Sequence, residues 1–538
     1  MNGRKKIMLF AIIAFVFSAC DDPGDVADNR PVIVSVIANE ERPTTALTLT
    51  FSGEMPGLTA DDIHISADFP VIKGKLTQTD TAVYKLPISP GGSGSITVGL
   101  APYSFTGWRV ATVEVFADVY TFALTSRLTI TGYNGSDGTV DIPEVMSGKP
   151  VEAIGNNAFR NKSLIGVTIP GSVEFIGVSA FANNQLTGII LPGSIQFIRD
   201  SAFAYNQLTS VVIPIGVTTI ENSVFANNQL IDIVIPDSVT TIGTSAFANN
   251  QLAGVDIPGS VTFIGASAFA NNQLTAVDIP NGIEYLSGFA GNQLTAITIP
   301  DSVTTIGTSA FANNQLASVD IPGSVAVIEA GAFDGNRLTR VAIPDGITEI
   351  TASAFANNQL TELIIPDGVT AIRTSAFEGN QLTGIDIPGS VTSIGAGAFA
   401  HNQLIDIAIP EHITAIGMRA FEYNELTELD LPDSVTSIGA SAFAHNKLTG
   451  VDIPNSVTSI GTGAFQGNQL TSVTIPDSVT IIMDAAFAEN PLTSITIGAG
   501  VAFRSTPFGG GFEPIYNNGK AAGTYTRTDS SSTEWTKE

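Results

Sequence analysis

The stretch that decides the fold is LTGIDIPGSVTSIGAGAFAHNQ, which runs from Leu382 to Gln403. Ile385 and Ile387 lie two residues apart, so both side chains point to the same face of a short strand. Pro388 ends this strand because it has no amide hydrogen for a ladder. The first half of the stretch therefore predicts one wall of a coil with an apolar inner face.

The second half of the same stretch predicts the opposite wall. Val391 and Ile394 begin another inward-facing segment, and Gly395 permits the tight turn that follows. Phe399 is the large side chain that fills the interior. The whole stretch is one turn of a two-walled coil.

This frame recurs along most of the chain. Phenylalanine recurs sixteen times at a spacing of 22 residues, with one step of 20. A fixed period of this length is typical of a solenoid, in which stacked coils share one core. We expect the rings to lie inside, about 4.8 Å from coil to coil. The clearest core candidates are Phe181, Phe203, Phe225, Phe247, Phe311 and Phe399.

Asparagine holds the place of Asn402 in fifteen of the sixteen units, and Lys162 holds it in the first. An amide at a fixed place can satisfy turn backbone groups that would otherwise be buried unpaired, so we expect a structural ladder. The 20-residue unit, Leu274–Gln293, lacks two residues before Phe289. It predicts a kink or a tightened turn, and both a hinge and a deletion without a role stay open.

The frame LxxVxIPxxVxxIGxxAFxxNx resembles the BspA-like, treponemal-type leucine-rich repeat over residues 128–497. That family usually has a 23-residue unit, often with cysteine near the place of Asn402, whereas this array has 22 residues and asparagine. The resemblance implies a leucine-rich repeat solenoid. It also implies a bacterial surface protein of a kind implicated in attachment to host matrix, other bacteria or cells.

Residues 1–19 have the layout of a secretory signal, with basic residues at 4–6 before an apolar run at 7–17. Eleven residues extend about 16 Å as a helix, about half a bilayer. Residues 17–20 resemble a bacterial lipobox, although that family usually has leucine where Phe17 stands. The resemblance implies that Cys20 carries the lipid that anchors the chain at the bacterial cell envelope. The alternative is an ordinary signal peptide with an incidental cysteine.

The remaining segments predict a tether, a small domain and a cap. Residues 20–30 are rich in aspartate, with proline and glycine, as in a solvated tether. Residues 31–124 contain six or seven short alternating runs, which predict a small β-sandwich that resembles bacterial immunoglobulin-like domains. Residues 498–538 are rich in aromatic side chains, which predicts a cap, with a hairpin around residues 517–520 and a loose end. The fold class is mainly β.

Composition narrows the chemistry. The formal net charge is −27, which repels phosphate backbones, so we expect no nucleic-acid partner, and it favours a monomer. Cys20 is the only cysteine, so no disulfide framework or cysteine-based metal site can form within the chain. His401 and His445 lie two coils apart, about 10 Å, too far to share a metal. We expect no catalytic residue, cofactor or metal.

The second and fourth residues after each leading leucine are expected to point outward from the first wall. Of these 32 places ten are acidic, one is basic and none is aromatic. An acidic face favours a basic protein partner or loosely held cations, or it is only a solvated surface. Three consecutive coils carry an aliphatic stripe, which marks a contact or stabilises the sheet across strands. The candidate binding residues are Ile190, Val212, Val234, Arg340, Glu362, Glu428, Asp430 and Asp452.

These features favour a surface-exposed, adhesin-like binding scaffold that uses one face of the solenoid to contact a host or bacterial surface protein. A passive envelope component without a specific ligand is the alternative. An enzyme is a remote third possibility, because no nucleophile has a partner base and no phosphate-binding loop is present.

Overall fold

The computed structural model describes residues 33–38, 46–51, 63–66, 71–73, 77–80, 83–90, 94–100, 110–115, 120–124, 127–135, 138–146, 149–509 and 511–538. The regular elements of this part of the chain are β-strands joined by turns, with one short helix, α1 (Phe512–Asn517). No helix in it is long and apolar enough to cross a membrane. The expected signal peptide, the tether and Cys20 lie outside the described residues, so those expectations stay predictions.

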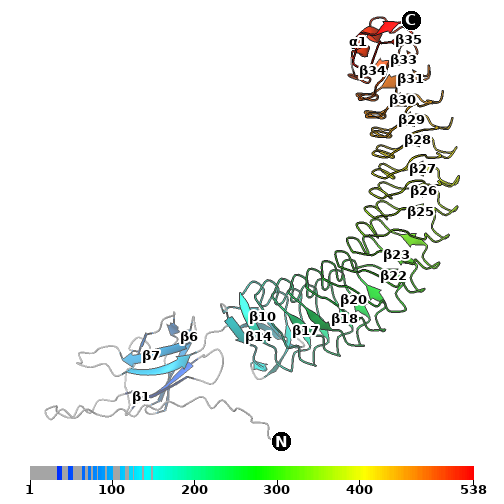
Figure 1. Cartoon of the computed structure of the whole chain (residues 1–538). Coiled ribbons are helices and arrows are strands. Elements are labelled where there is room, and N and C mark those ends of the chain that lie inside the picture. Colours follow the sequence, from blue (N-terminus) through cyan, green and yellow to red (C-terminus); the bar gives the residue numbers. More distant parts are fainter. Residues whose placement is uncertain are drawn as a thin grey trace.

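The N-terminal strands form two antiparallel sheets (Figure 1). One sheet has the order β1-β2-β6-β4, with β5 also paired to β6, and the other has the order β3-β7-β8. Two antiparallel sheets agree with a sandwich, and the immunoglobulin-like assignment stays a prediction. The strands are β1 (Ile33–Ala38), β2 (Ala46–Phe51), β3 (Ile63–Ser66), β4 (Val71–Lys73), β5 (Thr77–Asp80), β6 (Val83–Pro90), β7 (Gly94–Leu100) and β8 (Val110–Val115).

The repeats form a solenoid, which confirms the predicted fold, and the coils follow an arc (Figure 1). Their second wall carries short strands that pair in parallel from coil to coil, as Ile372 does with Ile394. The strands are β13 (Lys149–Ile154), β15 (Phe175–Ile176), β16 (Phe197–Ile198), β18 (Thr219–Ile220), β20 (Thr241–Ile242), β21 (Phe263–Ile264), β22 (Tyr285–Leu286), β23 (Thr305–Ile306), β24 (Val327–Ile328), β25 (Glu349–Ile350), β26 (Ala371–Ile372), β27 (Ser393–Ile394), β28 (Ala415–Ile416), β29 (Ser437–Ile438), β30 (Ser459–Ile460), β32 (Ile481–Ile482) and β34 (Ala502–Phe503).

The first wall is less regular than the sequence predicts. The segment Ile385–Ile387 is not a strand, although Ile385 is buried as expected. Backbone hydrogen bonds between coils lengthen on this wall, to 3.5 Å from the Thr449 amide to the Thr427 carbonyl, beyond the usual 2.9–3.0 Å. The wall is therefore too open for a continuous ladder. Its strands are β11 (Gly138–Asp141), β14 (Leu164–Thr168), β17 (Ser210–Val212), β19 (Asp232–Val234), β31 (Ser472–Ile475) and β33 (Ser494–Ile497).

The core is a file of stacked phenylalanine rings. All sixteen repeat phenylalanines are fully buried, and neighbouring ring centroids lie 5.0 to 6.0 Å apart. These distances exceed the 4.8 Å strand spacing, as suits offset aromatic stacking. The file is longer than the sequence repeat, because Tyr133 stacks on Phe159 and Phe508 stacks on Phe487. One continuous interior therefore joins the array to both of its ends.

The asparagines form a second buried file. The Asn402 amide donates to the carbonyls of Phe377 and Phe399 at 2.9 and 3.2 Å, and its oxygen accepts the Leu382 amide at 3.1 Å. All fifteen asparagine oxygens accept the amide of the leading leucine of the same coil. Each side chain thus ties two coils together and satisfies buried backbone groups.

A left-handed backbone at two places in nearly every coil was not foreseen. The residues two before and two after the phenylalanine have positive φ, as Ser375 (53°) and Gly379 (70°) do around Phe377. Serine, asparagine and glycine fill most of these places, and asparagine and glycine adopt this conformation most readily. His401, Arg419, Tyr423 and other larger residues also adopt it, because the stacked coils hold the backbone there.

The short coil, Leu274–Gln293, lacks the turn that other coils form around the phenylalanine. Its Gly288 has φ 107°, and Ser287 is fully buried instead of left-handed. The Tyr285 hydroxyl donates to the Glu329 carboxylate at 3.0 Å, and the Thr308 hydroxyl donates to it at 2.7 Å. Tyr285 therefore reaches from the short coil past the following coil to Glu329 in the coil after it.

Both ends of the array are covered. At the N-terminal end β9 (Tyr120–Leu124) pairs antiparallel with β10 (Leu128–Tyr133), and β12 (Val145–Met146) pairs with β13. At the C-terminal end β35 (Gly523–Thr526) pairs with β33, and β36 (Thr536–Lys537) pairs with β35.

Two expectations for the C-terminal segment are wrong. Residues 517–520 end α1 and form a turn, not a hairpin, because the strand before the turn is replaced by a helix whose Phe512 and Tyr516 are buried. The last residues are not loose, since Trp535 is buried and β36 pairs with β35. Aromatic packing orders this segment.

Candidate binding surface on the first wall

The outward places of the first wall are open to solvent. Of the 32 residues at the second and fourth places after each leading leucine, 29 are exposed and three are half-buried. The half-buried residues, Gly166, Ser494 and Thr496, lie at the two ends of the array, where neighbouring strands cover them. The wall therefore presents two side chains per coil along almost its full length.

The aliphatic residues of three consecutive coils are strongly exposed. Ile190, Val212 and Val234 expose 86%, 64% and 52% of their surface, and Val212 lies directly opposite Val234 in the β17–β19 ladder. Ile215, which the sequence reasoning missed, is 80% exposed. It follows Pro214, at a place where most other coils have glycine, aspartate or asparagine, and that contrast was the available signal. We call Ile190, Val212, Ile215 and Val234 the aliphatic patch.

The charged residues of the first wall have no charged or hydrogen-bonded partner among the residues that the structure describes. None of its eleven charged side chains, Arg340 among them, makes a hydrogen bond or ion pair with another described residue. The ion pairs of the described array lie on the second wall or on the turns beside the core rings, as Arg373–Glu349 and Lys447–Glu425 do. The first wall therefore carries uncompensated negative charge.

A hollow of about 980 Å³ lies on the acidic part of this wall. It spans four coils, and Glu362, Asp386, Asp406 and Asp430 are among its lining residues. Of the other charged candidates from the sequence, Glu428, Asp452 and Arg340 are exposed but lie outside the hollow. The structure thus separates the candidates into an aliphatic part and an acidic part on one wall.

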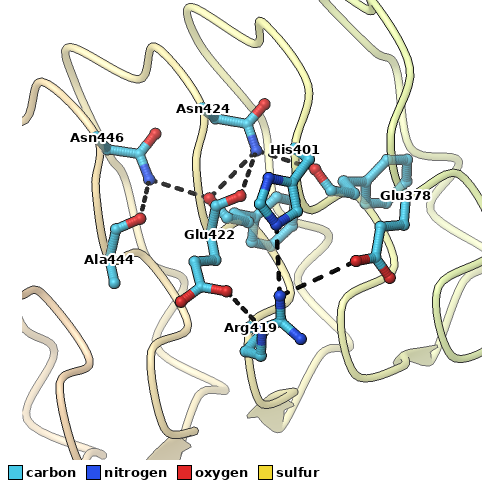
Figure 2. A network of polar contacts seen from close by, with 9 residues as sticks. Glu378, His401, Arg419, Glu422, Asn424, Ala444 and Asn446 are labelled. Atoms are coloured by element: carbon cyan, nitrogen blue, oxygen red, sulfur yellow. Dashed lines mark hydrogen bonds and ion pairs between the residues drawn. The ribbon is translucent and has the colours of Figure 1, made fainter. Parts of the chain in front are cut away.

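The histidines that the sequence singled out are joined by a residue it did not. The rings of His401 and Tyr423 stack at 4.8 Å between centroids, and those of Tyr423 and His445 at 4.4 Å. Arg419 lies beside them, with its Nη2 3.4 Å from the His401 Nε2 (Figure 2). Tyr423 stands where most coils have asparagine or glycine. An aromatic residue at this place is the sequence feature from which the ring stack could have been predicted.

Ion pairs fix Arg419 in this network. It pairs with Glu422 and lies 3.9 Å from the Glu378 carboxylate (Figure 2). The hydrogen bond to Glu422 raises the pKa of the Arg419 guanidinium. His401 therefore lies against a cation and a phenol ring. Within the described ranges, no group of three or more His, Cys, Asp or Glu is placed to hold a metal ion.

Comparison with known proteins agrees with this architecture. The description "BspA type Leucine rich repeat region" matches in six copies, over residues 152–276, 285–405 and 392–508. Among curated protein sequences, no relative matches the chain. Leucine-rich repeat solenoids are typically non-enzymatic binding scaffolds.

Solved structures with the same kind of repeat are distant. The pneumococcal vaccine antigen PcpA is 18% identical, with a TM-score of 0.42, over 72% of this chain and 96% of its own. A leucine-rich cell surface protein from Faecalibacterium prausnitzii A2-165 is 24% identical, with a TM-score of 0.31, over 74% of this chain and 95% of its own. A T. pallidum leucine-rich repeat protein is 22% identical, with a TM-score of 0.21, over 53% of this chain and 87% of its own. On the family match, which spans more than half of its length, the chain belongs to the BspA-type leucine-rich repeat family.

Proposed function

We propose that this protein is an adhesin-like binding scaffold at the bacterial cell surface, anchored by lipid on Cys20, that contacts protein partners through the first wall of its solenoid. The observation that carries the proposal is the contrast between the inside and the outside of the coils. The leading leucine is the same in all sixteen units, whereas the outward places of the first wall hold nine residue types. Stacking of the coils requires the leucine, whereas the outward places are free to vary and can serve recognition.

The electrostatics of the first wall support a basic protein partner. Ten carboxylates and one guanidinium stand there without an ion pair to any residue in the described ranges. Unpaired charges of one sign attract an oppositely charged surface and speed its association, and the attraction falls as salt is added. A standard protein contact buries about 800 Å² on each partner, which a few neighbouring coils can supply.

The sequence supports the anchor. The chain's only cysteine stands two small residues after the apolar run, at the residue where lipidation requires it. More than one acyl chain is needed for stable anchoring. Fractionation with lipid labelling tests this part, because Cys20→Ser should lose both the label and the membrane association. Retention of the mutant in the membrane would contradict it.

Matched charge variants test the binding role. The purified full chain is applied to immobilised matrix proteins and to cells at increasing salt. A variant with four first-wall carboxylates neutralised is compared with one in which four carboxylates elsewhere are neutralised, so both change the net charge equally. The first set is Glu362→Gln, Asp386→Asn, Asp406→Asn and Asp430→Asn, and the control set is Glu144→Gln, Glu152→Gln, Glu174→Gln and Glu284→Gln.

We expect salt-sensitive binding that the first set weakens and the control set leaves unchanged. Equal losses in the two variants would assign the effect to net charge and not to the wall. If the wild-type chain binds none of the surfaces, the passive envelope role accounts for the protein instead.

A further inference from the structure

The aliphatic patch continues directly into carboxylates. Along the fourth place after the leading leucine, consecutive coils carry Ile190, Val212, Val234, Asp256 and Asp278, and all five side chains are exposed. The first three are aliphatic and the next two are acidic. A ligand that follows this file therefore meets three apolar contacts and then two negative charges in a fixed order.

The spacing of the coils selects the shape of that ligand. Core rings in this region lie 5.3 to 5.7 Å apart, and paired strands such as β17 and β19 lie about 4.8 Å apart. An α-helix repeats one face every 5.4 Å or so, so each of its turns meets one coil. An extended chain repeats a face about every 6.8 Å, and over five coils it slips by about one coil.

We propose that this file binds an amphipathic α-helix of a partner protein, about five turns long, whose contact face is apolar for three turns and basic for the next two. This inference rests on the proposed binding function and names the kind of partner. Ile215, three residues after Val212 in the same coil, is a further exposed aliphatic residue near the apolar end. The small residues Gly188 and Ser210, at the second place of their coils, leave room for a helix to approach.

Other occupants fit less well. A second copy of the chain brings another net charge of −27 toward this acidic surface, which opposes association. The described residues of the chain itself contain only α1, a six-residue helix whose Phe512 and Tyr516 are buried in the C-terminal cap. A basic, helical partner remains as the occupant with matching charge and period.

Fluorescence anisotropy with a synthetic helix tests the proposal. The probe is an 18-residue peptide, crosslinked to hold the helix, with one leucine per turn for three turns and one lysine per turn for two. The comparison peptide has the same composition with the lysine turns placed between the leucine turns. We expect the full chain to bind the first peptide at least about tenfold more tightly than the second.

Variants of the full chain locate the contact. Ile190→Ser with Val212→Ser and Val234→Ser should weaken binding by at least about tenfold, because three apolar contacts are lost. Asp256→Asn with Asp278→Asn should weaken it several-fold and reduce its salt dependence. Ile364→Ser is the matched control, since Ile364 holds the same place in a later coil, is 82% exposed and has only Ala342 and Asp386 at that place in the neighbouring coils. It should bind as the wild type does.

Equal binding of the two peptides, or wild-type binding by the triple serine variant, would overturn the inference. Sedimentation of the chain without peptide tests for self-association. A dimer that the triple serine variant abolishes would overturn the inference and assign the patch to a second copy of the chain. If the peptide fails while the full chain still binds matrix or cells, only this inference is lost. If the chain binds no surface either, the proposed function fails with it.

Discussion

The amide of Leu382 donates to the side-chain oxygen of Asn402, near the end of the same turn of the solenoid, at 3.1 Å. The same asparagine donates to the carbonyls of Phe377 and Phe399. One side chain thus satisfies backbone groups from two successive coils, next to the ring that fills the core. These bonds recur along the array, and they hold the first wall in place while its outward side chains vary.

Removing the Asn402 amide should destabilise the array locally. Asn402→Ala leaves four buried backbone groups with fewer partners, at a cost of about 1–3 kcal/mol for each unsatisfied group. Amide hydrogen exchange should accelerate in the coils around Leu382 and Phe399. Gln403→Ala, at the exposed neighbouring residue, is the control and should leave exchange unchanged. Unaltered exchange in the asparagine variant would argue against the ladder.

Buried and exposed phenylalanines should respond differently to truncation. Phe311→Ala removes a fully buried ring from the middle of the stack and should cost about 3–5 kcal/mol. Phe263→Ala, at a ring that is 44% exposed on the second wall, should cost much less. Urea denaturation followed by circular dichroism measures both. Similar losses in the two variants would mean that the repeat rings do not form the core.

The sequence predicted the parts of the fold that repeat. A side chain that recurs every 22 residues, such as the phenylalanine of each unit, reveals a stacked core without any structure. The left-handed backbone around each phenylalanine was missed because serine, asparagine and glycine at these places also suit ordinary turns. Ile215 was missed because it lies after the proline, outside the strand whose alternation was used to assign outward places. The Tyr423 stack was missed because its rings lie 22 residues apart in the chain and meet only when the coils are stacked.

Relieving a left-handed alanine should stabilise the protein. Ala485 has φ 54°, a conformation that costs alanine about 1 kcal/mol more than glycine. Ala485→Gly should therefore raise the free energy of unfolding by roughly this amount. Ala486→Gly, at a buried residue without positive φ, should lower it, since a methyl group leaves the core. A loss of stability in both variants would contradict the assigned backbone.

The bridge that the Glu329 carboxylate forms with Tyr285 and Thr308 should make the free energy of unfolding depend on pH. The Thr308 hydroxyl bond lowers the pKa of the Glu329 carboxyl, as do the bonds from the Thr308 amide and the Tyr285 hydroxyl. Because the folded-state pKa lies below that of the unfolded chain, the contribution is present above the unfolded value. It is lost as the pH falls through the folded value.

Measuring the free energy of unfolding of matched variants between pH 7 and acid isolates this contribution. Glu329→Gln should be less stable than the wild type near pH 7 and should converge with it in acid. Glu362→Gln, whose carboxylate makes no hydrogen bond to a described residue, serves as the control and should show no such convergence. Parallel pH profiles for the Glu329 variant and the wild type would contradict the bridge.

Photocrosslinking on cells or immobilised matrix tests most directly whether the first wall is the surface that binds. A photoreactive phenylalanine analogue replaces Gly384 or Asp406 on the first wall, or Thr392 or Ser437 on the second, all four within neighbouring coils. If the first wall is the binding surface, covalent adducts with a partner protein should form from the first two sites and not from the other two. Adducts from the second-wall sites alone, or equal adducts from both walls, would contradict it.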